Sequence, residues 1–251
     1  MALRKDQGIV IYSINYGETD KLISILSQSE PRRTYYVRGI RKSKKRPISA
    51  TEIGSLVELD YYDKQGSEWN YVKEIVLLER FDSIKSSVSG LYFLAYITEI
   101  LNYLLPEGEK HEKEAQLIQL ALFEVEQNGF HYGILPFLKI RLLKSLGIVP
   151  IDFLCSDCGE EVYPKQQAEV SINLEIHCGD CRTLKRNDIE LIRFLRDCMA
   201  IQYSKLFSKI IPEYILFNSD RLLNQFLNFY IRKELKTEKD FYKLIRNELN
   251  V

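Results

Sequence analysis

The sequence lacks the motifs by which common enzymes and membrane proteins are recognised. No apolar run reaches the roughly 18 residues that a transmembrane helix needs, and no hydrophobic leader segment precedes the first strand-like pattern. No glycine is followed by lysine, so a P-loop is absent, and neither a G-x-G-x-x-G nor a G-x-S-x-G pattern occurs. We therefore expect a cytoplasmic protein without catalytic machinery.

Histidine is also scarce, with three in the chain, which leaves general acid–base chemistry poorly supplied. His111 and Glu112 begin a zincin-like motif, but the second histidine of that motif is missing. Carboxylates such as Asp60 and Asp63 could in principle hold Mg²⁺. A metal-dependent nuclease therefore stays open as an alternative.

The net charge is zero, but charges of opposite sign are segregated along the chain. Residues 1–82 carry a balance of +2, residues 83–182 a balance of −6, and residues 183–251 a balance of +4. The interval 31–51 contains eight basic residues and no acidic one. A polyanion responds to such a local field rather than to the total charge.

Short strands are expected throughout the first 80 residues. Apolar residues alternate along five segments, and turn residues at Gly17–Asp20 and Asp63–Gly66 separate some of them. The five segments are Gln7–Ile14, Lys21–Ser27, Thr34–Arg38, Leu56–Tyr62 and Trp69–Leu78. So many short strands suit a small closed barrel, and a five-stranded OB-fold is the expected form.

After Arg80, apolar residues recur at helical spacing. The expected helices cover Ser83–Leu105, Glu112–Asn128, Ile134–Leu146, a segment starting at Asn187, a segment near Asp220–Leu235, and Glu238–Leu249. We therefore predict an α+β protein of two domains. Residues 1–80 form the OB-fold β-barrel, and residues 81–251 form an α-helical domain with a cysteine-bearing insert at 154–184.

The insert carries two C-x₂-C hooks, Cys155 with Cys158 and Cys178 with Cys181. Two-residue spacers let each hook present both sulfurs to one ion, and tetrahedral zinc takes four such donors at about 2.3 Å. Alternating apolar residues between the hooks predict one strand that could bring them together: Val170, Ile172, Leu174 and Ile176. We predict one structural Zn²⁺ held by the four cysteines.

Other uses of the cysteines are disfavoured. The cytosol keeps thiols reduced, a redox C-x-x-C is not expected as a matched pair, and four thiolates leave no open position for catalytic zinc. His177 could replace a ligand but is interpreted as a bystander, and Cys198 is interpreted as a helix core residue. Nearby basic residues are expected to offset the negative charge of the thiolate site: Lys165, Arg182, Lys185 and Arg186.

The basic stretch of the predicted barrel consists of Arg32, Arg33, Arg38, Arg41, Lys42, Lys44, Lys45 and Arg46. Repulsion among these charges is unfavourable unless an anion is near, and phosphate contacts would supply one with a salt-sensitive affinity. Gly39 and Pro47 bracket the densest part, which predicts a loop between strands. We interpret the stretch as a DNA-binding segment, and an adaptor that binds an acidic protein is the alternative.

The first 80 residues contain seven tyrosines and the only tryptophan, but no phenylalanine. Tyr and Trp have polar tips that suit half-exposed positions, and OB barrels commonly stack unpaired bases on such rings. Adjacent tyrosines in a strand point to opposite faces, so at least half are expected to be packing residues. The candidate base-stacking residues are Tyr35, Tyr36, Tyr61 and Trp69, with Tyr62 and Tyr71 beside them.

Three further patterns stand in order along nearly the whole chain. They are GIV at 8–10 with YGETDK at 16–21, GIRKSKKR at 39–46, and FLKIRLLKSLG at 137–147 leading through Pro150 to the first cysteine hook. In order and spacing they resemble the RecO recombination-mediator family of bacteria. The neutral net charge departs from the basic character of many DNA binders.

The resemblance implies an N-terminal OB domain and a helical domain that carries zinc in many members, with Cys155, Cys158, Cys178 and Cys181 as ligands here. It implies a nucleoid-associated protein of DNA repair that binds single- and double-stranded DNA and anneals complementary strands. The implied partners are RecR and the acidic tail of single-strand DNA-binding protein, and RecA is loaded indirectly. The loop Arg38–Arg46 would be a main DNA contact.

Overall fold

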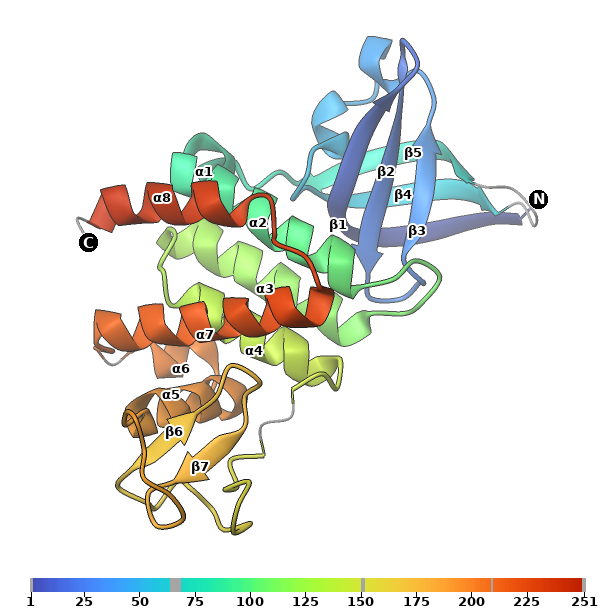
Figure 1. The fold of residues 1–251 in the computed structure, drawn as a ribbon. Helices are drawn as coiled ribbons and strands as arrows, with labels where there is room; N and C mark the ends of the chain where they lie inside the picture. The colour runs from blue at the N-terminus through green and yellow to red at the C-terminus, as the bar shows by residue number, and fades with distance from the viewer. Residues whose placement is uncertain (1, 64–68, 150–151, 209, 250–251) are drawn as a thin grey trace. The chain divides into compact units, whose positions relative to one another are not determined.

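The computed structural model describes residues 2–63, 69–149, 152–208 and 210–249 (Figure 1). Its contacts divide the chain into two compact units, one of Met1–Phe130 with Glu234–Val251 and one of His131–Lys233. The predicted turn at Asp63–Gly66 lies mainly outside the described residues, as does Pro150. The two-domain division at residue 80 and the insert bounds stay predictions.

A closed five-stranded barrel begins the first unit, as expected (Figure 1). Its strands are β1 (Ala2–Tyr16), β2 (Asp20–Ser27), β3 (Arg33–Val37), β4 (Leu56–Asp63) and β5 (Asn70–Glu79). The order β1-β2-β3-β5-β4 closes because β4 pairs back to β1. Only β3 and β5 run parallel, over two residue pairs, and the order is that of the OB-fold.

β1 starts five residues before its predicted start at Gln7. Its first half pairs with β4 and its second half with β2, with a register shift between Val10 and Tyr12. Polar residues of the first half, such as Arg4 and Lys5, carry no apolar alternation, so the sequence pattern could not mark them as strand. Hydrogen bonding to β4 makes that segment a strand.

The barrel interior is filled by aliphatic side chains and two tyrosines, Tyr35 and Tyr61. Both rings are fully buried, and they meet edge to face with their centroids 5.1 Å apart. The Tyr35 hydroxyl donates to the buried carboxylate of Asp6 at 2.7 Å. Burial raises the pKa of Asp6 although Ser27 and Tyr35 donate hydrogen bonds to it. Tyrosine can therefore replace phenylalanine in this core because its hydroxyl has a partner.

Four helices share the first unit with the barrel: α1 (Asp82–Ser86), α2 (Val88–Leu104), α3 (Glu112–Asn128) and α8 (Glu238–Leu249). The single helix predicted at Ser83–Leu105 is divided at Ser87, whose backbone is extended. The Ser87 hydroxyl accepts a hydrogen bond from the Gly90 amide at 3.0 Å and so caps α2. An apolar periodicity does not register such a break.

Arg32 joins the barrel to α2 and is 7% exposed. Its guanidinium donates to the Ser24 hydroxyl at 3.1 Å, to the Leu105 carbonyl and to the Asn102 side chain. The Asn102 amide in turn donates to the Ile11 carbonyl of β1 at 2.9 Å. The structure therefore places Arg32, one of the predicted DNA contacts, in the protein interior with its donors already bonded to protein groups.

The second unit contains α4 (Ile134–Ser145), β6 (Ala168–Val170), β7 (Ile176–Cys178), α5 (Ile189–Ala200), α6 (Tyr203–Leu206) and α7 (Glu213–Ile231). A fully buried ion pair links α4 to α7, with Lys139 Nζ 2.5 Å from a carboxylate oxygen of Asp220. α7 starts before its predicted start at Asp220, directly after Pro212, and ends where Arg232 adopts a left-handed backbone. The sequence pattern missed the short α6.

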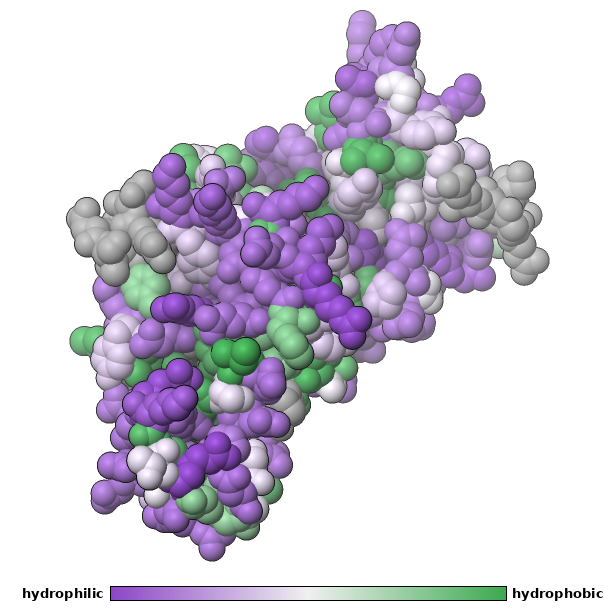
Figure 2. Space-filling view, in the orientation of Figure 1, coloured by the Kyte–Doolittle hydropathy of each residue, from purple (hydrophilic) through white to green (hydrophobic). Residues whose placement is uncertain are grey.

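None of the helices within the described residues is long and apolar enough to span a membrane. On the face drawn in Figure 2, hydrophobic residues form small separate groups among hydrophilic ones.

Candidate nucleic-acid interface and metal centre

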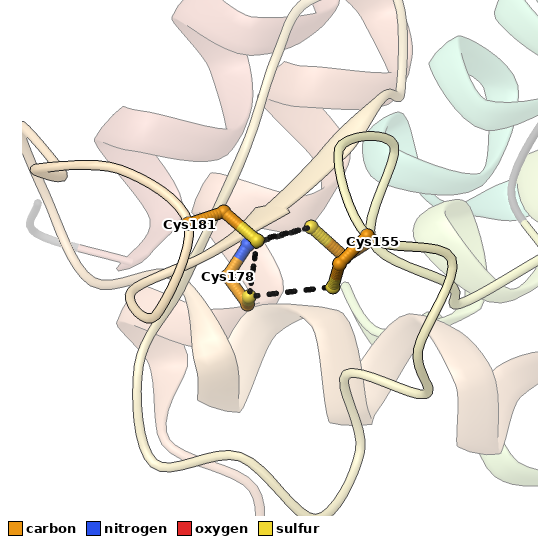
Figure 3. A group of neighbouring side chains, drawn as sticks. Cys155, Cys178 and Cys181 are labelled. Atoms are coloured by element: carbon orange, nitrogen blue, oxygen red, sulfur yellow. Dashed lines mark hydrogen bonds between the residues drawn. The ribbon is translucent and has the colours of Figure 1, made fainter.

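The four cysteines of the two hooks converge, with all their sulfurs within 4.8 Å of one another (Figure 3). The Sγ atoms of Cys155 and Cys181 are 3.9 Å apart, as are those of Cys158 and Cys178. Tetrahedral zinc with bonds of about 2.3 Å places its sulfurs about 3.8 Å apart, so the cluster fits such an ion. The structure therefore brings together all four predicted metal ligands.

Local backbone geometry builds each hook. Gly159 adopts a left-handed conformation with φ 72°, and its amide returns to the Cys155 carbonyl at 2.8 Å. Cys178 ends β7, and the Cys181 amide donates to its carbonyl at 3.2 Å. Burial opposes ionisation of Cys155, but backbone amides pointing at its sulfur hold the thiol pKa at about 6. A thiolate, which is the form that binds metal, is thus favoured at Cys155, whereas hydrogen bonds with the neighbouring cysteines raise the pKa of the Cys181 thiol.

The segment between the hooks differs from the single strand predicted there. β6 and β7 form a two-stranded antiparallel hairpin, with Ala168 opposite Cys178. The turn between them contains Leu174 in a left-handed backbone conformation, and Ile172 is 53% exposed. Alternating apolar residues could not reveal the turn because no glycine or proline marks it.

Three of the four basic residues predicted around the hooks are paired with carboxylates, whereas Lys185 is exposed and only its backbone amide donates to a carboxylate, that of Glu169, among the described residues. Arg182 forms two hydrogen bonds of 2.9 Å with Asp157, and Lys165 lies 2.8 Å from Glu160 and 2.7 Å from Asp180. Arg186 similarly lies 2.6 Å from Asp188. These side chains were expected to offset the charge of the sulfurs, but their direct partners are acidic side chains.

Two further residues near the hooks behave as bystanders. The Nδ1 atom of His177 lies 3.0 Å from the Asp157 carboxylate, and His177 is outside the sulfur cluster. Cys198 is fully buried on α5, where burial raises its thiol pKa.

The basic loop, residues 38–47, leaves β3 and leads toward β4. It contains a single 3₁₀ turn at Ile40–Lys42, and a second, Ile48–Thr51, follows it. Five of its cations are exposed and Arg46 is half-buried; the exposed ones are Arg38, Arg41, Lys42, Lys44 and Lys45. Arg33, before the loop, is half-buried and lies 3.3 Å from the Tyr61 hydroxyl.

Backbone contacts fix the base of the basic loop on the β1–β2 turn. The Arg41 amide donates to the Thr19 carbonyl at 2.9 Å, and its guanidinium donates to the Glu18 carbonyl at 3.0 Å. The Arg46 side chain donates to the Arg38 carbonyl. The YGETDK and GIRKSKKR patterns, separate in sequence, therefore form one structural unit.

A groove of about 790 Å³ runs between the basic loop and β5. Its walls carry four cations, Lys44, Lys45 and Arg46 from the loop and Lys73 from β5, and one carboxylate, Glu74; Val76 and Leu77 contribute apolar surface. β5 borders the groove where its short parallel pairing with β3 has ended. Lys73 is a cation that sequence reasoning did not single out.

An aromatic cluster lies on the outer face of the barrel: Tyr16, Tyr36, Trp69 and Tyr71. Tyr36 and Trp69 are stacked at 5.8 Å with an interplanar angle of 11°. Tyr16 is 42% exposed and Tyr71 is 38% exposed. The structure thus places the candidates Tyr36 and Trp69 together and adds Tyr16, which sequence reasoning missed although it precedes the GETDK turn.

Tyr35 and Tyr61, two of the predicted base-stacking residues, are by contrast buried in the barrel core. The pairing of β2 with β3 sets this outcome, because Tyr35 stands opposite the buried Ile23 while Tyr36 stands opposite Leu22 on the other face. A closed interior leaves no ring surface for a base.

Within the described residues, the four cysteines are the only group of three or more side chains placed to hold one metal ion. Asp60 and Asp63 belong to no such group, and Asp63 pairs with Arg4 at 3.0 Å.

Both the N-terminal and the C-terminal part of the chain match models of known protein families. Residues 1–81 match the family model "Recombination protein O N terminal", and residues 86–239 match "Recombination protein O C terminal". The chain belongs to the RecO family. It is 39% identical to the DNA repair protein RecO of Leptospira biflexa serovar Patoc over 246 residues, which is 98% of this chain and 99% of that protein.

Other RecO proteins are more distant but equally complete matches. Identity is 26% to the DNA repair protein RecO of Desulforamulus reducens, covering 99% of this chain and 98% of that protein. It is 25% to that of a Thermoanaerobacter species, covering 98% and 100%. Membership of RecO supports a role in DNA repair and recombination, and the N-terminal match coincides with the barrel.

Proposed function

We propose that this RecO-family chain is a recombination mediator that binds single- and double-stranded DNA and anneals complementary strands. With RecR it helps RecA replace single-strand DNA-binding protein on DNA. One observation carries the proposal: the exposed basic loop and the aromatic cluster meet at the β1–β2 turn of one barrel. The role is stoichiometric rather than catalytic.

The basic loop supplies the phosphate contacts. Arg38, Lys44 and Lys45 are exposed and form no salt bridge within 4.0 Å among the described residues, although Arg38 lies near enough to Asp20 to help lower its pKa. The charge of the two lysines is therefore available to an anion. Lys42 has a single, solvated partner, Glu18, at 3.9 Å. Neutralising phosphates on two strands lowers the repulsion between them and lets complementary bases pair.

The aromatic cluster supplies surfaces for unpaired bases. Tyr71 and Lys73 lie two residues apart on β5, and both are exposed. A DNA strand that leaves the aromatic cluster therefore meets the groove beside the basic loop next. Stacking on such rings is tolerant of sequence and contributes about 1–3 kcal/mol per base. This combination suits a protein that handles DNA of any sequence.

The four-cysteine site holds one structural Zn²⁺ in this proposal, bound by Cys155, Cys158, Cys178 and Cys181. Such an ion stabilises the fold around the hooks and takes no part in chemistry. The excess of basic residues in 183–251 suits the acidic tail of single-strand DNA-binding protein.

Titration of fluorescent single-stranded DNA at low and high salt tests the DNA-binding proposal, with Trp69 as the single intrinsic fluorophore of its kind. We expect salt-sensitive binding with quenching of Trp69. The triple variant Lys42→Glu, Lys44→Glu, Lys45→Glu should bind at least about a hundredfold more weakly, because three cations become anions. Arg41 is left unchanged because it also holds the loop.

The matched control reverses three exposed lysines outside the loop: Lys110, Lys113 and Lys205. It changes the net charge equally and should keep binding and strand annealing, including annealing on DNA coated with single-strand DNA-binding protein. Equal losses in both variants would reject the basic loop as the site. Loss of labelled DNA on adding Mg²⁺ would favour the nuclease, and negligible binding at both salt concentrations would favour the adaptor.

A further inference from the structure

The carboxylate of Asp20, the first residue of β2, lies where the aromatic cluster meets the basic loop. Its Oδ1 atom accepts hydrogen bonds from the Thr19 hydroxyl at 2.5 Å and from the Gly39 amide at 2.6 Å. Its Oδ2 atom accepts one from the Tyr36 hydroxyl. The Asp20 side chain is therefore hydrogen-bonded to the β1–β2 turn, to the start of the basic loop and to the aromatic cluster.

Gly39 is the point at which the chain leaves β3 and enters the basic loop. It adopts a left-handed backbone conformation with φ 65°, which L side chains rarely adopt. The bond from its amide to Asp20 fixes the direction in which Arg38 and Arg41 on either side extend. Without that acceptor, the start of the loop is held mainly by the Arg41 contacts with the β1–β2 turn.

Tyr36 is the central ring of the aromatic cluster. Its centroid is 5.8 Å from that of Tyr16, 5.8 Å from that of Trp69 and 5.3 Å from that of Tyr71. The bond from its hydroxyl to Asp20 fixes the outer edge of this ring. The aromatic cluster and the basic loop are therefore both hydrogen-bonded to the Asp20 carboxylate.

The Asp20 carboxylate is charged at neutral pH, because hydrogen bonds from Thr19, Tyr36 and Gly39, with a smaller contribution from the charge of Arg38, lower its pKa to about 2. A carboxylate beside a phosphate-binding loop repels a polyanion. The Asp20 carboxylate is explained if fixing the positions of Tyr36 and Gly39 favours DNA binding by more than the repulsion of phosphate by its charge disfavours it.

We propose that Asp20 is a positioning residue for nucleic acid, holding the stacking rings and the phosphate-binding loop in one binding-competent arrangement. The inference rests on the proposed DNA-binding function and names the residue on which its two subsites depend. Removing the Asp20 carboxylate should strengthen DNA binding if its charge matters most and should weaken DNA binding if its hydrogen bonds matter most, which makes the inference testable.

The test compares Asp20→Ala with Asp20→Asn, which remove the same charge. Asparagine keeps an oxygen for the Gly39 amide and can bond the Tyr36 hydroxyl, whereas alanine can do neither. We expect Asp20→Asn to bind single-stranded oligonucleotide at least as tightly as the wild type. Asp20→Ala should bind about tenfold or more weakly, with less Trp69 quenching and a shallower salt dependence, because both subsites lose order.

A second variant covers the case in which Asp20→Ala fails to fold. Tyr36→Phe keeps the ring and every charge but removes the hydroxyl, and it should weaken binding by a smaller factor. The double variant Asp20→Ala, Tyr36→Phe should bind no more weakly than Asp20→Ala alone, because both changes break one shared bond.

Binding by Asp20→Ala as tight as that of Asp20→Asn, or unchanged binding by Tyr36→Phe, would overturn the positioning role while leaving the proposed function standing. Failure of the wild-type protein to bind DNA would instead reject the proposed function itself.

Discussion

The basic loop and the cysteine insert both contain clustered positive charges, but the structure gives the two clusters different surroundings. In the insert, Lys165 and Arg182 each lie within 3 Å of a carboxylate, as does Arg186 just after it. In the loop, Arg38, Lys44 and Lys45 have no such partner among the described residues. The comparison teaches that a count of basic residues does not identify a polyanion site, because nearby carboxylates decide how much of that charge remains available.

The two regions are also stabilised by different means. The basic loop is attached to a barrel with a closed apolar core, and its hydrogen bonds go to carbonyls and to Asp20. The described part of the insert has a short two-stranded hairpin and a few buried aliphatic side chains, such as Val162 and Val170, so we expect its fold to depend largely on the sulfur cluster. Removing the metal ion that we propose for the four cysteines should therefore destabilise the insert and leave the barrel folded.

Metal removal should give the largest effect. A structural zinc contributes on the order of 10 kcal/mol to the folding of a small domain. Chelation, or the Cys178→Ser variant, should unfold residues 152–188, seen as fast amide hydrogen exchange there. Exchange in the barrel and the affinity for single-stranded DNA should stay within about twofold of the untreated protein.

The metal content of the purified protein, measured by mass spectrometry, is the control for this experiment. A barrel that loses DNA affinity in proportion to the metal lost would contradict this expectation, as would an insert that keeps its slow-exchanging amides without metal.

The second prediction compares two arginines of the basic stretch, the buried Arg32 and the exposed Arg38. Arg32→Ala should lower the free energy of unfolding by about 2–3 kcal/mol, because the buried Leu105 carbonyl and Asn102 lose their donor. Arg38→Ala should change it by less than about 0.5 kcal/mol, since Arg38 is exposed. Urea denaturation followed by circular dichroism measures both.

DNA titration of the same two variants should give the opposite ranking. Arg38→Ala should bind single-stranded DNA several-fold more weakly, and folded Arg32→Ala should bind like the wild type. If Arg32→Ala proved as stable as the wild type but deficient in binding, the assignment of Arg32 to the interior would be wrong.

Arg32 and Arg38 show which features of the structure could be predicted from the sequence and which could not. Strand alternation predicted the barrel, and hook spacing predicted the four ligands, because both signals depend on local periodicity. Whether Arg32 or Arg38 faces solvent depends on Asn102 and Leu105, about 70 residues away along the chain. Tyr35 and Tyr36 were likewise indistinguishable until their pairing with β2 set which one faces the core. Tertiary contacts and strand pairing, rather than local sequence, set which of these predicted site residues are buried.

The smallest effect is expected from removing two charges in each region. Lys44→Ala with Lys45→Ala should weaken binding of single-stranded DNA about tenfold, which corresponds to about 1.4 kcal/mol. If each lysine contacts one phosphate, the slope of log affinity against log salt should fall by about 1.4, at about 0.7 per contact. Titrations at four or five salt concentrations measure both quantities.

Lys165→Ala with Arg182→Ala is the matched pair, because it changes the net charge by the same amount. These side chains already neutralise Glu160, Asp180 and Asp157, so their removal should leave both the affinity and the salt slope nearly unchanged. A loss of affinity shared by both pairs, and shrinking in both as the salt concentration is raised, would indicate a long-range effect of net charge, which salt screens beyond about 10 Å at 0.1 M. A loss confined to the loop pair, with the reduced slope, requires phosphates bound at the loop and identifies local counter-charge as the difference between the two regions.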